Sequence, residues 1–210
     1  MLSIKSIKKD IIAVCRLMYE KGYISATDGN VSVRFQKHEM LITATGTHKG
    51  LLKEEDIIVT DLEGNRISGQ KKPSSEIMMH LKVYEKCKGI SAVIHAHPPI
   101  CTAISLTNSS IPTTFTPEVY ISFGRKIPVA RYATPSTSEV PEAISEFLPD
   151  FKALLLARHG TLTMGKNLWD AFYRLEKMEN AAHVFLLAKH LGGAEPIAEE
   201  KLKLLDQLFH

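Results

Sequence analysis

The sequence contains little cysteine: three residues in a chain of 210, with no C-x-x-C pair. An odd number in unrelated positions gives no disulfide framework, so Cys15, Cys87 and Cys101 are expected to be small buried apolar residues in a reducing compartment. None of them lies in a setting that would stabilise a thiolate, which argues against a nucleophilic cysteine. Cysteine usage therefore predicts a cytoplasmic protein.

Long apolar runs and long basic runs are also absent. No window holds eighteen consecutive apolar residues, and residues 1–10 are polar and lack the apolar segment of a secretory signal. The net charge is +3, and the lysines are scattered without interleaved aromatic residues, which argues against nucleic acid as a partner. With 44% hydrophobic and 23% charged residues, the chain is expected to form a single domain, residues 1–210, with a substantial core.

Hydrophobic periodicity predicts an α/β chain. Apolar residues at helical spacing predict a helix over 4–22, and alternation predicts an antiparallel meander over 31–35, 40–43 and 57–60. The later elements are expected to be a helix opened by 72–76 and ending near 86, a strand over 92–97, a short helix over 100–106, an irregular stretch through 117, a strand over 126–130, a helix over 138–147, a strand over 153–157, a long helix over 167–192 and a last amphipathic segment over 197–208. The order predicts a mostly antiparallel sheet between helices.

Two histidines end one of the predicted strands. His95 and His97 are separated by one residue, and strand side chains alternate faces, so both imidazoles should project from the same side. Pro98 stops the strand immediately afterwards. Two nitrogen atoms aimed at one point suit a zinc-type ion. With nine histidines in the chain, a pair at this spacing can also arise by chance.

A second predicted strand delivers His159, which could become a third ligand if the two strands are neighbours in the sheet. Three protein ligands with an open fourth position form the catalytic arrangement of zinc. Glu76 is the natural fourth group, able to ligate the ion at rest and to act as a general base once substrate displaces it. Simpler alternatives are a turn histidine at position 159 and a carboxylate at Glu76 that complements a helix dipole. His80, one helical turn after Glu76, is a rival ligand.

Three turns offer backbone N–H groups and short polar side chains beside strand or helix ends. Such turns suit a phosphate group, and a serine pair at a helix N-terminus suits it further. None is a P-loop, and each alone is more often only a turn. Beside a metal site, they indicate a small phosphorylated substrate. The residues are Gly29, Asn30, Thr45, Gly46, Ser74 and Ser75.

Five motifs, taken in order, make the chain resemble a known family. They are Gly29-Asn30-Val31-Ser32-Val33, Thr43-Ala44-Thr45-Gly46, Lys72-Pro73-Ser74-Ser75-Glu76, His95-Ala96-His97 and Arg158-His159-Gly160. In this order they resemble the class II aldolase/adducin family, and the resemblance covers about residues 10–192. It implies a three-layer α/β/α fold with a mostly antiparallel central sheet, and a homotetramer with active sites at subunit interfaces.

The resemblance also implies roles for the residues that match the motifs. His95, His97 and His159 correspond to the ligands of one Zn²⁺ per subunit, with Glu76 as a fourth ligand and as the catalytic acid/base. The three turns correspond to a phosphate cradle. The activity implied is that of a metal-dependent lyase, an aldolase that cleaves a ketose 1-phosphate similar to L-fuculose 1-phosphate. Its products would be dihydroxyacetone phosphate and an aldehyde, formed through a metal-stabilised enediolate.

Alternatives within the family remain open at this point. A pentulose-phosphate 4-epimerase is disfavoured, because the position that corresponds to Glu76 looks like an aspartate in those enzymes. A methylthioribulose-1-phosphate dehydratase is favoured by Thr47-His48-Lys49-Gly50, although the longer insertion after the His-x-His segment is missing. A non-catalytic, adducin-like interaction domain is disfavoured by the intact histidine triad. The chain also has Phe115 where fuculose-phosphate aldolases place a tyrosine that protonates the aldehyde side, so Tyr120, or else the nearby Glu118, is expected to act as the second catalytic residue.

Overall fold

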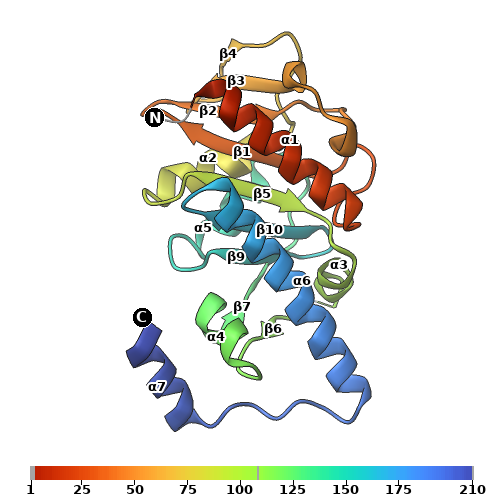
Figure 1. Ribbon diagram of the computed structural model, residues 1–210, viewed down its shortest axis with the longest axis vertical. Coiled ribbons are helices and arrows are strands. Elements are labelled where there is room, and N and C mark those ends of the chain that lie inside the picture. The colour runs from red at the N-terminus through yellow and green to blue at the C-terminus, as the bar shows by residue number, and fades with distance from the viewer. Residues whose placement is uncertain (1–2, 108, 210) are drawn as a thin grey trace.

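An eight-stranded sheet organises the computed structural model, which describes residues 3–107 and 109–209 (Figure 1). The strand order is β4-β3-β2-β1-β5-β10-β9-β8, and all neighbours are antiparallel except β8 and β9. The strands are β1 (Asn30–Phe35), β2 (Glu39–Thr43), β3 (Ile57–Asp61), β4 (Arg66–Ser68), β5 (Ala92–Ala96), β8 (Val129–Ala130), β9 (Ala153–Leu156) and β10 (Gly160–Gly165).

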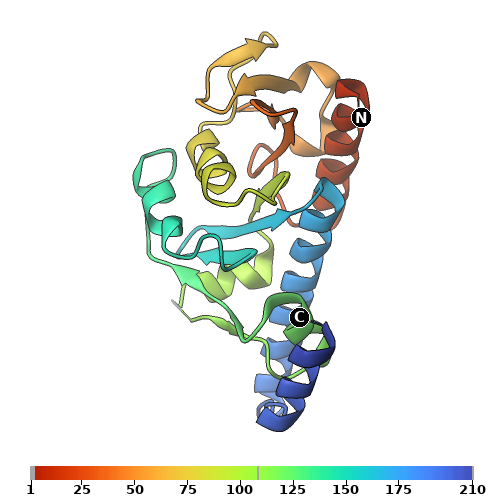
Figure 2. The same ribbon diagram turned by 90° about the vertical axis from the view of Figure 1, so that its left-hand side faces the viewer.

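Helices cover both faces of this sheet. Figure 2 shows α1 and α6 on one face, with α2 and α5 on the other. None of the helices in the described ranges combines the length and the apolarity that a membrane crossing requires. The remaining elements are α1 (Ile4–Glu20), η1 (Lys49–Leu51), η2 (Glu54–Asp56), α2 (Ile77–Lys86), α3 (Pro99–Ser105), β6 (Ile111–Pro112), α4 (Pro117–Phe123), β7 (Lys126–Ile127), α5 (Glu139–Ser145), α6 (Leu168–His190) and α7 (Glu199–Phe209).

The alternation of strand side chains divides the core into two layers. On β2, Met40 and Ile42 pack toward α2 and α5, whereas Leu41 packs toward α1 and α6. On β5, Val93 and Ile94 divide in the same way. All five side chains are fully buried, as expected for strands in the middle of three layers. The predicted α/β/α fold with a mostly antiparallel sheet is confirmed.

Several elements differ from the sequence-based expectation, and the single strand expected over 126–130 is instead two short strands, β7 paired with β6 and β8 paired with β9. The strand β10 was not predicted, since its glycines and threonines dilute the apolar alternation of Leu162 and Met164. The helix α4 lies in the stretch expected to be irregular, because seven residues are too few to show a helical period. The strand β4 is three exposed residues long and carries no burial pattern.

The positions of β5 and β9 correct a further expectation. They are not neighbours, because β10 lies between them and is antiparallel to both. Because β10 is antiparallel to both of its neighbours, β5 and β9 run in the same direction. Their carboxyl ends therefore lie at the same edge of the sheet. That edge carries His95 near the end of β5, His97 directly after β5, and His159 after β9.

The start of α2 is also shifted from the prediction. The helix begins at Ile77, so Glu76 occupies the N-cap position rather than the first turn. Its backbone N–H donates to the Ser74 hydroxyl oxygen at 3.3 Å. The carboxylate makes no capping hydrogen bond to the helix. It is therefore free to face the edge of the sheet where the histidines lie.

Candidate active site

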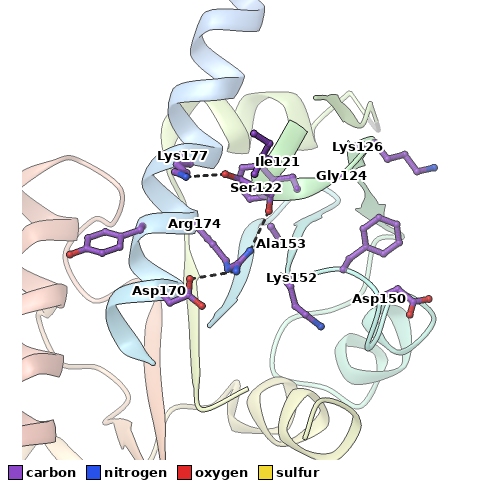
Figure 3. A pocket seen from close by; sticks show the side chains of 13 residues that line it. Ile121, Ser122, Gly124, Lys126, Asp150, Lys152, Ala153, Asp170, Arg174 and Lys177 are labelled. Atoms are coloured by element: carbon purple, nitrogen blue, oxygen red, sulfur yellow. Dashed lines mark hydrogen bonds and ion pairs between the residues drawn. The ribbon is translucent and has the colours of Figure 1, made fainter. Parts of the chain in front are cut away.

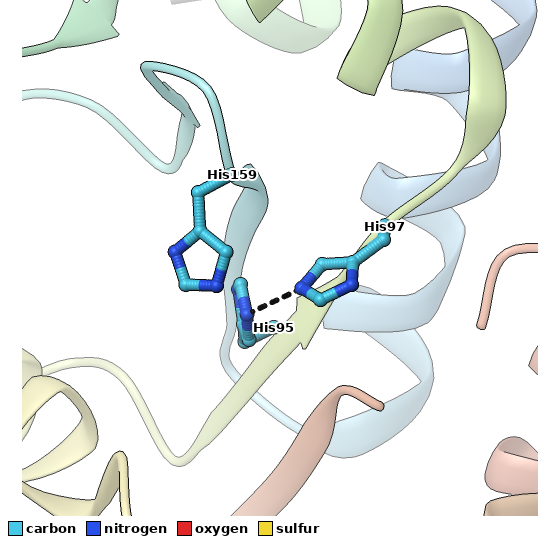
Figure 4. A group of neighbouring side chains, drawn as sticks. All are labelled: His95, His97 and His159. Atoms are coloured by element: carbon cyan, nitrogen blue, oxygen red, sulfur yellow. Dashed lines mark hydrogen bonds between the residues drawn. The ribbon is translucent and has the colours of Figure 1, made fainter. Parts of the chain in front are cut away.

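Three histidines converge at the edge of the sheet (Figure 4). One ring nitrogen each from His95, His97 and His159 lies within 4.8 Å of the others. The Nε2 atoms of His95 and His97 are 2.9 Å apart. His95 is fully buried, and the other two side chains are partly exposed. The structure thus brings together the three residues that the sequence predicted as ligands.

Local backbone geometry aims these rings. The Nδ1–H of His95 donates to the carbonyl oxygen of Thr161 on β10 at 2.8 Å, which leaves the Nε2 lone pair directed at the cluster. Arg158 adopts φ +59° in the tight turn between β9 and β10. A Cβ atom on Gly160 would lie 2.5 Å from the carbonyl oxygen of Ala96. The glycine therefore lets the turn approach β5 and bring in His159.

Electrostatics keeps two of the imidazoles neutral. Burial, and then the neighbouring rings of His97 and His159, hold the pKa of His95 well below its usual value of 6.5. Burial, and then His159, also lower the pKa of His97. A neutral imidazole is the form that ligates a metal ion. Converging neutral nitrogens beside a carboxylate make a donor set that fits a divalent ion of the zinc type.

The carboxylate of Glu76 lies against this cluster. Its Oε2 atom is 3.3 Å from His95 Nε2, and its Oε1 atom is 3.6 Å from His159 Nε2. The side-chain amide of Asn30 donates to Oε2 at 2.9 Å. Oε1 is buried and has no hydrogen-bond partner among the described residues. One carboxylate oxygen is therefore held in place while the other remains available for an ion or a proton.

A cavity of about 220 Å³ opens beside the cluster. It gathers segments that are distant in sequence, including all six residues predicted to form the phosphate cradle. His95 does not line the cavity and lies behind it, fully buried. The lining residues are Thr27, Asp28, Gly29, Asn30, Ala44, Thr45, Gly46, Lys49, Ser74, Ser75, Glu76, His97, Pro135, Ser136 and His159.

The glycines of the predicted cradle have a conformational reason to be there. Gly29 and Gly46 adopt φ +70° and +67°, a region that side chains with a Cβ rarely occupy. A Cβ on Gly29 would also lie 2.8 Å from the carbonyl oxygen of His95. Both turns therefore depend on glycine to pass close to the site.

Asn30 differs from its predicted place in the cradle. It lines the cavity, but its side chain is buried and occupied, with its amide on Glu76 and its carbonyl oxygen 2.5 Å from His80 Nε2. The Thr45 backbone N–H is also occupied, since it donates to the carbonyl oxygen of Lys72 at 3.1 Å. Asn30 therefore lines the cavity while its side chain binds Glu76 and His80.

Lys49 is a cavity residue that the sequence analysis did not predict. It is the only lysine or arginine lining the cavity in the described part of the chain. Its Nζ atom donates to the carbonyl oxygens of Thr27 and Thr47 at 2.9 and 2.8 Å, which leaves one of three protons unassigned. Burial lowers its pKa from the usual 10.5. The signal in the sequence was its position three residues after the glycine of the second turn.

The structure does not support His80 as a rival metal ligand. Its ring is fully buried, with Nδ1 at 2.7 Å from the Ser32 hydroxyl and Nε2 at 2.5 Å from Asn30 Oδ1. Both ring nitrogens are therefore engaged with polar partners. Burial lowers its pKa to about 3, so the ring is neutral at physiological pH.

Tyr120 is not brought to this cavity within one chain. It is buried in α4, and its hydroxyl donates to Asp206 Oδ1 on α7 at 2.8 Å. Tyr120 does not line the cavity that contains Glu76. The proton-transfer role expected for it would require a contribution to the site of another subunit.

A larger cavity, of about 680 Å³, lies between α4, α6 and β9 (Figure 3). It shares no lining residue with the histidine-lined cavity. Several of its polar groups pair with one another: Arg174 lies 3.4 Å from Asp170, and Lys177 donates to the Ser122 hydroxyl at 2.9 Å. Metal-ligating groups converge at the smaller cavity, so we place the active site there.

The chain is similar to known proteins in both sequence and fold. Residues 9–186 match the family model described as the class II aldolase and adducin N-terminal domain. An L-fuculose phosphate aldolase of Methanococcus maripaludis is 37% identical over 183 residues, covering 87% of this chain and 97% of that protein. A 3-oxo-tetronate 4-phosphate decarboxylase of Haemophilus influenzae is 35% identical over 182 residues, covering 85% and 86%. A solved L-fuculose 1-phosphate aldolase superposes with a TM-score of 0.91 at 33% identity, covering 100% and 98%.

Proposed function

Because this chain belongs to the class II aldolase and adducin family and is a lyase, we propose that it is a zinc-dependent aldolase of a ketose 1-phosphate. The substrate proposed is L-fuculose 1-phosphate or a close analogue, cleaved to dihydroxyacetone phosphate and an aldehyde. One observation carries the proposal above the others. The Glu76 carboxylate faces the imidazole nitrogens at the wall of a cavity that the three predicted phosphate turns also line.

In this proposal His95, His97 and His159 would hold the zinc ion, with the Glu76 carboxylate beside them as a fourth donor. The bound ion supplies Lewis-acid stabilisation of the negative charge that develops on the substrate oxygens. When the C3–C4 bond breaks, the C4 hydroxyl passes its proton through water to the Glu76 carboxylate and becomes the carbonyl group of the leaving aldehyde, while the electron pair of the broken bond remains on the dihydroxyacetone phosphate half as an enediolate. Glu76 then delivers a proton to C3, or removes one from C3 in the direction of condensation.

The unpartnered oxygen of Glu76 is the atom that carries this proton. Asn30 donates to Oε2, so that oxygen is already occupied, whereas Oε1 is buried without a partner in the described ranges. A carboxylate held by one oxygen keeps its orientation while the other accepts and releases a proton. The phosphate group is assigned to Gly29, Gly46 and the Ser74-Ser75 turn, with charge supplied by Lys49.

A decarboxylase is the second candidate, and the Haemophilus influenzae relative favours it. Loss of CO₂ from a carbon next to the carbonyl also leaves an enediolate, so the same residues would serve. The methylthioribulose-1-phosphate dehydratase remains a third candidate within the family. The three are separated by their products: an aldehyde, CO₂ or water.

We further propose that four subunits assemble, with active sites at their interfaces, as other members of the family are expected to do. In this assembly Tyr120 would contribute to a neighbouring site only if its hydroxyl left Asp206. The cytoplasmic location and the single domain over 1–210 stay predictions. Sedimentation of the zinc-loaded protein tests the assembly, and a monomeric species with full activity would contradict it.

The test of the activity is proton exchange at C3 of dihydroxyacetone phosphate in D2O, followed by NMR with zinc-loaded protein. It needs no aldehyde, so it examines the half of the reaction that the site geometry supports. We expect exchange by the wild-type protein and a loss of at least about 100-fold in Glu76→Gln, because the general base is removed.

The control and the opposite outcome are both informative. Zinc content and thermal unfolding of Glu76→Gln show whether the variant remains folded and loaded. No exchange by folded, zinc-bound wild-type protein would contradict the aldolase and the decarboxylase together, and would leave the dehydratase. Exchange followed by a screen of aldehydes and of 3-oxo acid phosphates would distinguish the first two.

A further inference from the structure

A row of buried polar groups runs from the interior to the carboxylate of Glu76. The Tyr84 hydroxyl is 2.7 Å from the Ser32 hydroxyl, which is 2.7 Å from His80 Nδ1. On the other side of the ring, His80 Nε2 is 2.5 Å from Asn30 Oδ1, and the Asn30 amide nitrogen is 2.9 Å from Glu76 Oε2. Four consecutive hydrogen bonds thus connect five side chains of β1, α2 and the turn before α2.

Only one direction of donation satisfies all of these groups. An ionised carboxylate can only accept, so the Asn30 amide must present its N–H to Glu76 and its oxygen to His80. The opposite orientation would place two acceptor oxygens against each other. His80 must then donate from Nε2, and the neutral ring accepts at Nδ1 from Ser32, which accepts from Tyr84. Every group donates toward Glu76.

The inner end of this row is anchored. Tyr84 is fully buried against the sheet, and the Arg34 guanidinium donates to its carbonyl oxygen at 2.6 Å. The same guanidinium lies over the Tyr84 ring, 5.0 Å from its centroid. The row therefore starts from a fixed side chain and lies between rigid elements. Hydrogen bonds aligned in one direction polarise and strengthen one another in a low-dielectric interior.

We propose that His80 is a positioning residue, which fixes the orientation of the Asn30 amide and through it the reactive orientation of the Glu76 carboxylate. The inference rests on the proposed function, since it assigns how the acid/base of that reaction is held. His80 touches neither the substrate nor the three metal-ligating histidines in this role. Its hydrogen bonds with Ser32 and Asn30 set its tautomer, which in turn sets the direction of the whole row.

The kinetic test compares His80→Leu with His80→Gln and with a control, Thr163→Val. Leucine removes both ring nitrogens, whereas the amide of glutamine can still donate to Asn30. Thr163 is likewise fully buried, and its hydroxyl donates to the Ala171 carbonyl oxygen at 3.0 Å without a link to Glu76. For C3 proton exchange, His80→Leu is expected to lose about 10–100-fold in kcat, as partners of site residues commonly do. KM should change little, because the phosphate contacts remain.

Two further results are expected from the same variants. His80→Gln should recover most of kcat, and Thr163→Val should keep it. In a Glu76→Gln background, His80→Leu should cause no additional loss, since the two residues act as a unit. Equal loss in His80→Leu and His80→Gln, an equal loss in the control, or an additive loss in the double variant would overturn the proposal.

A spectroscopic readout does not depend on activity. In metal-free protein labelled with ¹⁵N-histidine, His80 should carry its proton on Nε2 with Nδ1 bare at pH 7. A proton on Nδ1 would reverse the row and overturn the proposal directly. If the wild-type protein shows the expected tautomer but no C3 exchange, the proposed function fails and the hydrogen-bond row stands. If exchange is normal in both wild type and His80→Leu, only the positioning role fails.

Discussion

We expect the buried ammonium group of Lys49 to contribute to the affinity for a phosphorylated substrate. Its ammonium group is held by two backbone carbonyls at the wall of the cavity, where the other charged or titratable groups among residues 3–107 and 109–209 are two carboxylates and two histidines. A hydrogen bond to a charged partner contributes about 1.5–3 kcal/mol. Lys49→Met should therefore raise KM for the phosphorylated substrate by about 10–100-fold, with a smaller change in kcat. Steady-state kinetics, or the Kd of dihydroxyacetone phosphate by calorimetry, provides the measurement.

Lys72→Met is the matched control for this prediction. Lys72 is exposed and does not line the cavity, so its removal should leave KM within about twofold, as for most surface changes. Thermal unfolding of both variants separates a loss of affinity from a loss of fold. Equal KM values in Lys49→Met and wild type would remove Lys49 from the phosphate site.

His80 makes stability depend on pH. Its pKa is about 3 in the folded protein and 6.5 in the reference state, so between these values the unfolded chain binds the proton first. The contribution of the neutral ring is fully present above pH 6.5 and is lost as the pH falls toward 3. For this one group the loss approaches about 1.4 kcal/mol per pH unit.

Urea unfolding of metal-free protein between pH 7 and pH 4.5 measures this effect. The free energy of unfolding should fall with pH in the wild type, and less steeply in His80→Gln, which cannot titrate. The difference between the two curves isolates His80 from the other histidines. Parallel curves would show that the buried ring does not resist protonation.

At the scale of elements, the turn between β9 and β10 positions His159 at the proposed metal site. It brings His159 to His95 although β10 separates their strands, and it can do so because Gly160 has no Cβ to meet Ala96. Gly160→Ala should push the turn away from β5 and weaken zinc binding by about 10–100-fold, the range found when groups supporting metal ligands are altered.

Competition with a chromogenic chelator measures that affinity. Gly89→Ala is the control, because nothing lies within 4 Å of a Cβ at Gly89. Zinc affinity should remain at the wild-type value in this control. Unchanged affinity in Gly160→Ala would show that the turn can move without displacing His159.

At the scale of the whole molecule, zinc should stabilise the fold by mass action. An ion that binds only the folded state adds about 2.7 kcal/mol at a concentration of 100 times its Kd. For a chain of this size, each kcal/mol shifts Tm by about 2–4 °C, so saturation should raise Tm by roughly 5–10 °C. Thermal unfolding with and without chelator provides the measurement. His159→Gln should lose most of the shift, and an equal shift in this variant would place the stabilising ion elsewhere.

Much of the fold and of the site was readable from local pattern. The helices α1 and α6, the strands β1, β2 and β5, and the motifs around Glu76 and the histidines carry signals that depend only on neighbouring residues. Periodicity of apolar residues, turn formers and ligand spacing act within a few residues of one another. Local pattern is therefore enough to predict helices on both sides of a mostly antiparallel sheet and to select the histidines that the fold brings together.

Only the tertiary structure decided what depends on residues far apart in the chain. It placed β10 between the two histidine strands, brought the Asn30 amide to Glu76, and set Lys49 at the cavity wall. It also engaged His80 with Ser32 and Asn30, where the sequence allowed a metal ligand. Hydrogen-bond partners and burial are properties of packing, and packing brings together groups as far apart in the chain as Tyr120 and Asp206, which are separated by 86 positions.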